Sequence, residues 1–159
     1  MEFQKRPNAS ILIVDDEQGV RESLRMILKS SYKIYLAQGG EEALTCIQKN
    51  KIDLILLDLR MPGLSGLDTL REIRKISADI DVIIVTAYGT IANVQQAITC
   101  GVSDFITKPF DVFEVLHVVN RTIKKRYDIL KTEAIFQEIR SLTESDGKVP
   151  PNGPLSRRE

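Results

Sequence analysis

Short apolar runs separated by amphipathic segments constrain the fold of this 159-residue chain more than any other feature. The strongest runs are residues 11–14, 54–57 and 82–85, and a weaker one is 105–106. Uninterrupted apolar runs of this length, rich in β-branched residues, are typical of strands buried on both faces of a parallel sheet. Residues 33–37 are less uniformly apolar, which suits an edge strand.

Between these runs, apolar residues recur with the spacing of an α-helix. One such set is Val20, Leu24, Ile27 and Leu28. Ser65 and Asp111 stand where helix N-caps are expected, just before apolar helical patterns. Strand and helix alternate five times, and right-handed crossovers join such units. The sequence therefore predicts an α/β fold with a doubly wound, five-stranded parallel sheet.

The last helical pattern continues beyond the expected end of the domain. Its further apolar residues are Tyr127, Leu130, Ala134, Ile135, Ile139 and Leu142. Residues 126–142 fit a helical extension or short coiled coil, and equally a solvated amphipathic helix. Residues 143–159 hold five Pro or Gly and two aliphatic residues, which favours a flexible tail or linker. We therefore expect a tail at 1–8, a domain at 9–125, an extension at 126–142 and a second tail at 143–159.

Composition excludes several functional classes. Lys+Arg 22 balances Asp+Glu 22, which argues against a surface built wholly for nucleic acid or anionic membrane. The basic stretch 121–131 is not followed by a helix-turn-helix pattern, so we expect no direct DNA binding. No apolar run reaches the ~18 residues of a membrane span. Cys46, Cys100 and His117 lack the spacing of a disulfide framework or metal site. We expect a soluble cytoplasmic protein.

Charged and hydroxyl side chains come just after the apolar runs. Asp15 and Asp16 follow the first run, Asp58 the second, Thr86 the third, and Lys108 lies two residues past the last. In an open parallel sheet, ligands bind beyond the carboxyl ends of the strands. Taken singly, each residue is more readily explained as a helix cap, a turn residue or a surface lysine. Their joint placement favours a single polar site.

Three carboxylates gathered in one place repel each other, and a divalent cation relieves this repulsion. Mg²⁺ prefers oxygen ligands, usually one or two carboxylates with water. A metal ion, a lysine and a hydroxyl can together hold the peripheral oxygens of a phosphoryl group. An aspartate can also serve as the nucleophile that accepts it. The residues therefore favour magnesium-dependent phosphoryl chemistry.

Four motifs together resemble the receiver domain of bacterial two-component response regulators. They are ILIVDDE (11–17), LILLDLRMPGLSGLD (54–68), VIIVTAYG (82–89) and DFITKPF (104–110). The resemblance covers about residues 9–125 and is closest to nitrogen-regulatory and related enhancer-binding activators. It implies a flavodoxin-like sheet with strand order 2-1-3-4-5.

The resemblance also implies a role for each site residue. Asp58 corresponds to the phosphoacceptor, which takes its phosphoryl group from a partner sensor histidine kinase. Asp16 and Asp58 correspond to direct Mg²⁺ ligands, together with the backbone carbonyl of Arg60. Asp15 corresponds to a ligand that acts through water. In this family the bond between Lys108 and the following proline is usually cis.

The remaining roles implied by the resemblance concern the response to phosphorylation. Thr86 and Lys108 correspond to the residues that bond the phosphoryl oxygens, and Phe105 to the aromatic switch residue. The readout face then comprises the helix at 91–98, the strand of Phe105 and the final helix. This face can present a homodimer surface. The output domain is expected outside this chain, because no phosphate loop or ATPase motif is present.

Two alternatives stay open at the level of sequence. A magnesium-dependent phosphatase of the haloacid-dehalogenase type also uses an aspartate nucleophile and a lysine. That family requires a second aspartate two residues after the nucleophile, where this chain has Arg60. The other alternative is a receiver-like interaction module that is not phosphorylated, against which the intact acidic set argues. Our prediction is a regulatory domain rather than an enzyme, limited to self-phosphorylation and self-dephosphorylation.

Overall fold

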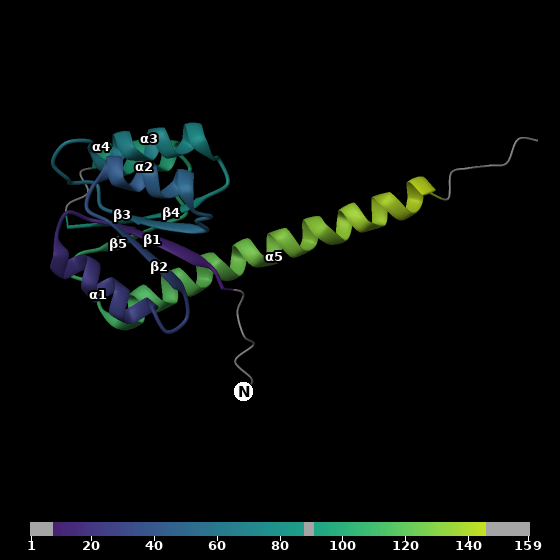
Figure 1. Ribbon diagram of the computed structural model, residues 1–159, viewed down its shortest axis with the longest axis horizontal. Helices are drawn as coiled ribbons and strands as arrows, with labels where there is room; N and C mark the ends of the chain where they lie inside the picture. The colour runs from purple at the N-terminus through teal and green to yellow at the C-terminus, as the bar shows by residue number, and fades with distance from the viewer. Residues whose placement is uncertain (1–7, 88–90, 146–159) are drawn as a thin grey trace, which may run out of the picture. The chain divides into compact units, whose positions relative to one another are not determined.

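The computed structural model describes residues 8–87 and 91–145, whose course is shown in Figure 1. Strands and helices alternate along the chain, as the sequence predicts. The elements are β1 (Ser10–Val14), α1 (Gln18–Leu28), β2 (Lys33–Ala37), α2 (Gly40–Lys49), β3 (Leu54–Leu57), α3 (Gly66–Ile76), β4 (Asp81–Thr86), α4 (Ile91–Thr99), β5 (Asp104–Thr107) and α5 (Val112–Ser145). The chain divides into two compact units between Lys124 and Lys125.

The five strands form one parallel sheet in the order β2-β1-β3-β4-β5, which confirms the predicted fold. The less apolar strand β2 is at an edge, as expected. Every residue of the central strands β1 and β3 is buried, because helices cover both faces of the sheet. Helices α2, α3 and α4 pack on one face, and α1 and the first part of α5 pack on the other (Figure 1).

Local signals in the sequence fix where two of the helices begin. The Ser65 hydroxyl accepts a hydrogen bond from the amide of Asp68 at 3.2 Å and so caps α3. The Asp111 carboxylate accepts one from the amide of Glu114 at 2.8 Å, ahead of α5. Both bonds satisfy amides that have no partner within the helix, so both predicted N-caps are confirmed.

A close approach at the start of α3 constrains the turn after β3. A Cβ atom on Gly66 would lie 2.2 Å from the carbonyl oxygen of Asp58 and 2.4 Å from the Cα of Leu59. Both neighbours are backbone atoms, which cannot turn aside as a flexible side chain can. Glycine at position 66 therefore lets α3 begin directly against the turn that carries Asp58.

Helix α5 has buried apolar residues only near its beginning. Val115, Val119 and Ile123 are buried in the core, whereas Leu130 and Phe136 are exposed. The helix continues to Ser145, three residues past Leu142, because no proline or glycine lies between Leu142 and Gly147. The predicted tail at 143–159 and the tail at 1–8 otherwise lie almost wholly outside the described residues. Within the described part of the chain, no helix is long and apolar enough to span a membrane.

Candidate functional site

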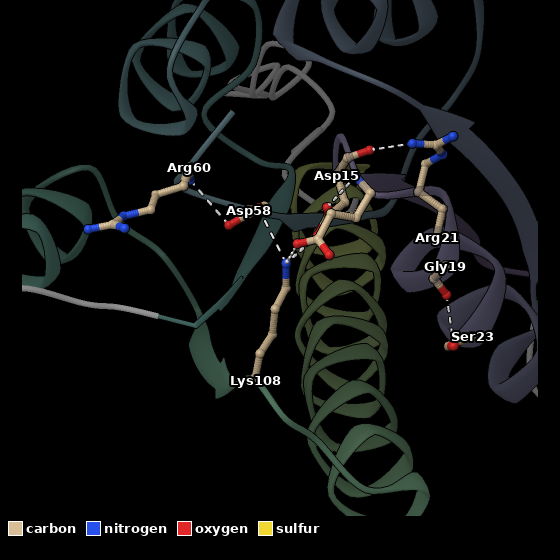
Figure 2. A network of polar contacts seen from close by, with 8 residues as sticks. Asp15, Gly19, Arg21, Ser23, Asp58, Arg60 and Lys108 are labelled. Carbon is tan, nitrogen blue, oxygen red and sulfur yellow. Dashed lines mark hydrogen bonds and ion pairs between the residues drawn. The ribbon is translucent and has the colours of Figure 1, made fainter. Parts of the chain in front are cut away.

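The side chain of Lys108 joins residues from three strand ends. Its Nζ atom lies 2.6 Å from Asp15 Oδ2, just after β1, and 3.3 Å from Asp58 Oδ2, just after β3 (Figure 2). Lys108 itself follows β5. The structure thus brings three of the predicted site residues together at the carboxyl edge of the sheet, where parallel strands place their ligand sites.

Asp58 is a buried carboxylate, with 4% of the residue exposed. Its amide donates to the carbonyl of Val14 at 3.0 Å, which continues the pairing of β3 with β1. Its Oδ1 accepts a hydrogen bond from the amide of Arg60 at 3.2 Å. Burial raises the pKa of Asp58, and this effect outweighs the opposing contacts with the Arg60 amide and Lys108. A more basic carboxylate is a better nucleophile once it is ionised.

The Lys108 ammonium is held in its charged form by the carboxylates that surround it. Burial alone would lower its pKa, but the contacts with Asp15 and Asp58 outweigh burial and raise it. A third carboxylate, that of Glu17, lies 3.7 Å away. Lys108 is therefore a positive charge at neutral pH, placed beside the Asp58 carboxylate.

The turn after β1 gathers oxygen ligands of the kind that Mg²⁺ prefers. Asp15, Asp16 and Glu17 each offer a carboxylate oxygen, and the three oxygens lie within 4.8 Å of one another. Asp15 is buried, whereas Asp16 and Glu17 are exposed. Asp58 is not part of this group, but Lys108 contacts both the Asp58 carboxylate and the Asp15 carboxylate of the group. This set of hard oxygen donors, open to solvent on one side, fits a magnesium ion.

Thr86 and Phe105 lie on the neighbouring strands β4 and β5. Thr86 is buried, and its Oγ1 has no hydrogen-bond partner among the described residues. Its carbonyl accepts from the amide of Lys108 at 3.0 Å, so the two residues are neighbours at the sheet edge. Phe105 is half-buried against the core and pairs in register with Ile84. The peptide bond between Lys108 and Pro109 is cis.

Two residues of this polar network were not among the predicted site residues. Glu17 contacts Lys108, and its acidic neighbours in the sequence could have indicated it. Arg21 of α1 is buried and donates from Nη1 to the carbonyl oxygen of Asp15 at 2.8 Å. Arg21 stands three residues before Leu24 and seven before Leu28, on the buried side of the helix. The spacing of Arg21 from these two leucines in the sequence could have indicated that it is buried.

Comparison with known proteins agrees with this geometry. Residues 11–120 match the family model of the response regulator receiver domain. Sporulation initiation phosphotransferase F of Bacillus subtilis is 37% identical over 115 residues, which are 72% of this chain and 93% of that protein. Response regulator MprA of Mycobacterium sp. is 39% identical over 107 residues, which are 67% of this chain and 46% of that protein. The chain thus matches less than half the length of MprA.

Solved structures give the same result. A CheY-like receiver domain protein from Methanospirillum hungatei superposes with a TM-score of 0.74 at 25% identity, over 77% of this chain and 98% of that one. NtrX from Brucella abortus superposes with a TM-score of 0.73 at 32% identity, over 80% of this chain and 29% of that one. The similarity to NtrX agrees with the resemblance to enhancer-binding activators.

The chain belongs to the response regulator receiver family. It is a phosphoryl-accepting switch domain of two-component signalling, and the family match favours this function over the phosphatase alternative.

Proposed function

We propose that Asp58 accepts the phosphoryl group from a phosphohistidine of a partner sensor histidine kinase. A carboxylate oxygen of Asp58 forms a bond to phosphorus while the bond between phosphorus and the histidine nitrogen breaks. The nitrogen keeps the electron pair of that bond, and the product is an aspartyl phosphate. The domain promotes its own phosphorylation and dephosphorylation and has no other catalytic activity.

The observation that carries this proposal is the contact of Lys108 with two carboxylates from different strands. Its Nζ lies 3.3 Å from Asp58 Oδ2, so a positive charge already stands where a phosphoryl group on Asp58 would add negative charge. Asp58 is also buried, which limits access of water to an acyl phosphate. Together these features support phosphoryl acceptance at Asp58. The Oδ2 atom of Asp15 lies closer to Lys108 Nζ, at 2.6 Å, and is therefore more fully engaged by that ammonium than Asp58 is.

The same reasoning assigns a metal role to the acidic turn. Asp16, Asp58 and the backbone carbonyl of Arg60 would bind Mg²⁺ directly, and Asp15 would bind it through water. When bound, Mg²⁺ neutralises charge on the phosphoryl oxygens during transfer. The exposed carboxylate of Asp16 and the hard oxygen chemistry of the cluster support this assignment.

Thr86 and Phe105 would convert phosphorylation into a change of shape. The buried Thr86 hydroxyl lacks a partner among the described residues, so a phosphoryl oxygen on Asp58 would offer the hydrogen bond that it lacks. Movement of Thr86 toward that oxygen would leave room for the ring of Phe105 to turn inward. Phosphorylation would then shift a two-state equilibrium in favour of the inward state.

Intact mass measurement with acetyl phosphate and Mg²⁺ tests the proposal. The wild-type chain is expected to gain the mass of one phosphoryl group, and Asp58→Ala none. Asp128→Asn is the matched control, since Asp128 is an exposed acidic residue of α5, and it should label like wild type. Labelling of Asp58→Ala to the wild-type level would contradict the assignment.

We also propose that phosphorylation strengthens a homodimer formed by α4 and α5, which passes the signal to an output domain outside this chain. Exposed apolar residues on both helices support this, among them Ile98 on α4 and Phe113 at the start of α5. Light scattering with and without beryllofluoride tests it. A monomeric mass both without beryllofluoride and at beryllofluoride concentrations that saturate Asp58 would contradict this proposal.

A further inference from the structure

Arg21 is an arginine in an unusual environment for its residue type. Only 9% of Arg21 is exposed, because it lies on the buried face of α1 together with Leu24 and Leu28. Its Nη1 donates to the backbone carbonyl oxygen of Asp15 at 2.8 Å, in a buried hydrogen bond (Figure 2). Burying a guanidinium is unfavourable unless its hydrogen bonds are made, so this contact is specific rather than incidental.

The bond from Arg21 completes the set of contacts that hold Asp15. The Asp15 amide donates to the carbonyl of Ala37 at 3.2 Å, and Oδ1 accepts from the amide of Glu17 at 2.9 Å. Oδ2 accepts from Lys108 at 2.6 Å, and the carbonyl accepts from Arg21. In Figure 2, Arg21 and Lys108 approach Asp15 from different sides. Every polar group of Asp15 therefore has a partner.

Electrostatics explains why the turn after β1 needs this support. Asp15, Asp16 and Glu17 are consecutive carboxylates whose oxygens lie within 4.8 Å of one another, so their mutual repulsion favours an open turn. Lys108 offsets this repulsion from β5. Arg21 adds a second positive charge from α1 and attaches the backbone of the turn to that helix.

We propose that Arg21 is a positioning residue for the magnesium-dependent reaction. It holds the backbone at Asp15 so that the carboxylates of residues 15–17 stay gathered before the metal ion arrives. This inference rests on the proposed function, because it assumes that Asp16 of this turn binds Mg²⁺ directly and that Asp15 binds it through water. Arg21 acts through Asp15 and is not itself assigned a contact with metal or phosphoryl group.

Calorimetric titration of the full chain with Mg²⁺, in the absence of any phosphodonor, tests this role. Groups that orient metal ligands typically change metal affinity by about 10–100-fold when they are removed. Arg21→Gln is therefore expected to raise the Kd for Mg²⁺ by at least about tenfold. Arg25→Gln is the matched control, since Arg25 lies one turn further along α1 and forms an ion pair with Glu22 of the same helix. It should leave the Kd unchanged.

A second readout separates positioning from general stability. Leu28→Ala removes a buried side chain from the same helix, far from the turn in sequence, and should lower the urea midpoint while leaving the Kd for Mg²⁺ unchanged. In Arg21→Gln, the half-maximal rate of labelling by acetyl phosphate should require about tenfold more Mg²⁺. At saturating Mg²⁺ the labelling rate should approach that of wild type. A lowered plateau with an unchanged Mg²⁺ requirement would contradict the positioning role.

The result that overturns the inference is a Kd within about twofold of wild type in folded Arg21→Gln, or an equal loss of affinity in Leu28→Ala. If Arg21→Gln does not fold, Arg21→Lys takes its place. Its ammonium is shorter and not forked, so an affinity at least about threefold below wild type is expected. Wild-type affinity in that variant would overturn the inference. Mg²⁺ binding by wild type without phosphoryl labelling would instead contradict the proposed function alone.

Discussion

The bodies of the sheet strands and their carboxyl ends differ in what they contribute. Within β1 and β3 every residue is buried and the side chains are almost all apolar. One residue further along, Asp15 and Asp58 are just as buried but carry carboxylates. Burial of apolar side chains stabilises the fold, whereas burial of a carboxylate costs free energy unless it is compensated.

Residues that stabilise the fold and residues that serve the site are therefore direct neighbours in the chain. The carboxylate of Asp58 is compensated by Lys108 and by the Arg60 amide, yet its pKa is still raised by burial. The charges at the strand ends therefore lower the stability of the fold, and burial of the apolar strand bodies offsets this cost. Substitutions in the two regions should accordingly act on different properties, and three predictions test this from the largest expected effect to the smallest.

The largest effect is expected from Leu56→Ala in the body of β3. Leu56 is 1% exposed, and truncation of a buried leucine typically costs about 2–5 kcal/mol. Urea unfolding should show this loss, while the fraction of folded protein labelled by acetyl phosphate stays at the wild-type level. A loss below about 1 kcal/mol would contradict the assignment of β3 to the core.

An intermediate effect is expected from Gly66→Ala, because this position connects the two regions. The added Cβ would meet the carbonyl oxygen of Asp58 at 2.2 Å, so the backbone of the turn must move. Overpacking of this kind typically costs about 1–3 kcal/mol. Both the urea midpoint and the rate of phosphoryl labelling should fall. Gly19→Ala is the control, since a Cβ there meets no atom within 4 Å, and it should leave the labelling rate unchanged.

The smallest effect, and one of opposite sign, is expected from Asp58→Asn at the strand end. Because the folded-state pKa of Asp58 is raised, ionisation of this carboxyl weakens the native state. The variant should therefore be more stable than wild type at pH 7. As the pH falls below the ordinary carboxyl pKa of about 4, both chains are neutral at this position and the difference should vanish.

Urea unfolding across that pH range checks the prediction. The stability of wild type relative to the variant should decrease from about pH 4 upward and become constant above the raised pKa of Asp58. A variant that is less stable than wild type at pH 7 would show that the contact with Lys108 outweighs the burial of the carboxylate.

Much of the fold and part of the site could be predicted from the sequence for simple physical reasons. Apolar runs reveal buried strands, and Asp15 and Asp58 follow such runs directly, so strand register alone places them at one edge. Lys108 follows from the same reasoning. The sequence could not show which carboxylates its ammonium contacts, because that depends on side-chain conformation.

Arg21 and the end of α5 were harder for a different reason. Arg21 lies within an amphipathic helix, where a polar residue beside apolar ones is normally exposed, so only the spacing to Leu24 and Leu28 indicated its burial. The change of composition at Thr143 suggested an end for the last helix. The helix runs on to Ser145, because polar residues without proline or glycine do not by themselves stop a helix.

The most direct test of the central claim is a Mg²⁺ titration followed by the backbone amide resonances of the full chain. If the strand ends form one metal-binding edge, the amides of residues 15–17 and 58–60 should shift together with a single Kd, while those within β1 and β3 stay in place. In Asp58→Asn the same amides should require a higher Mg²⁺ concentration. Independent Kd values for the two segments, or no shift in either, would contradict the account.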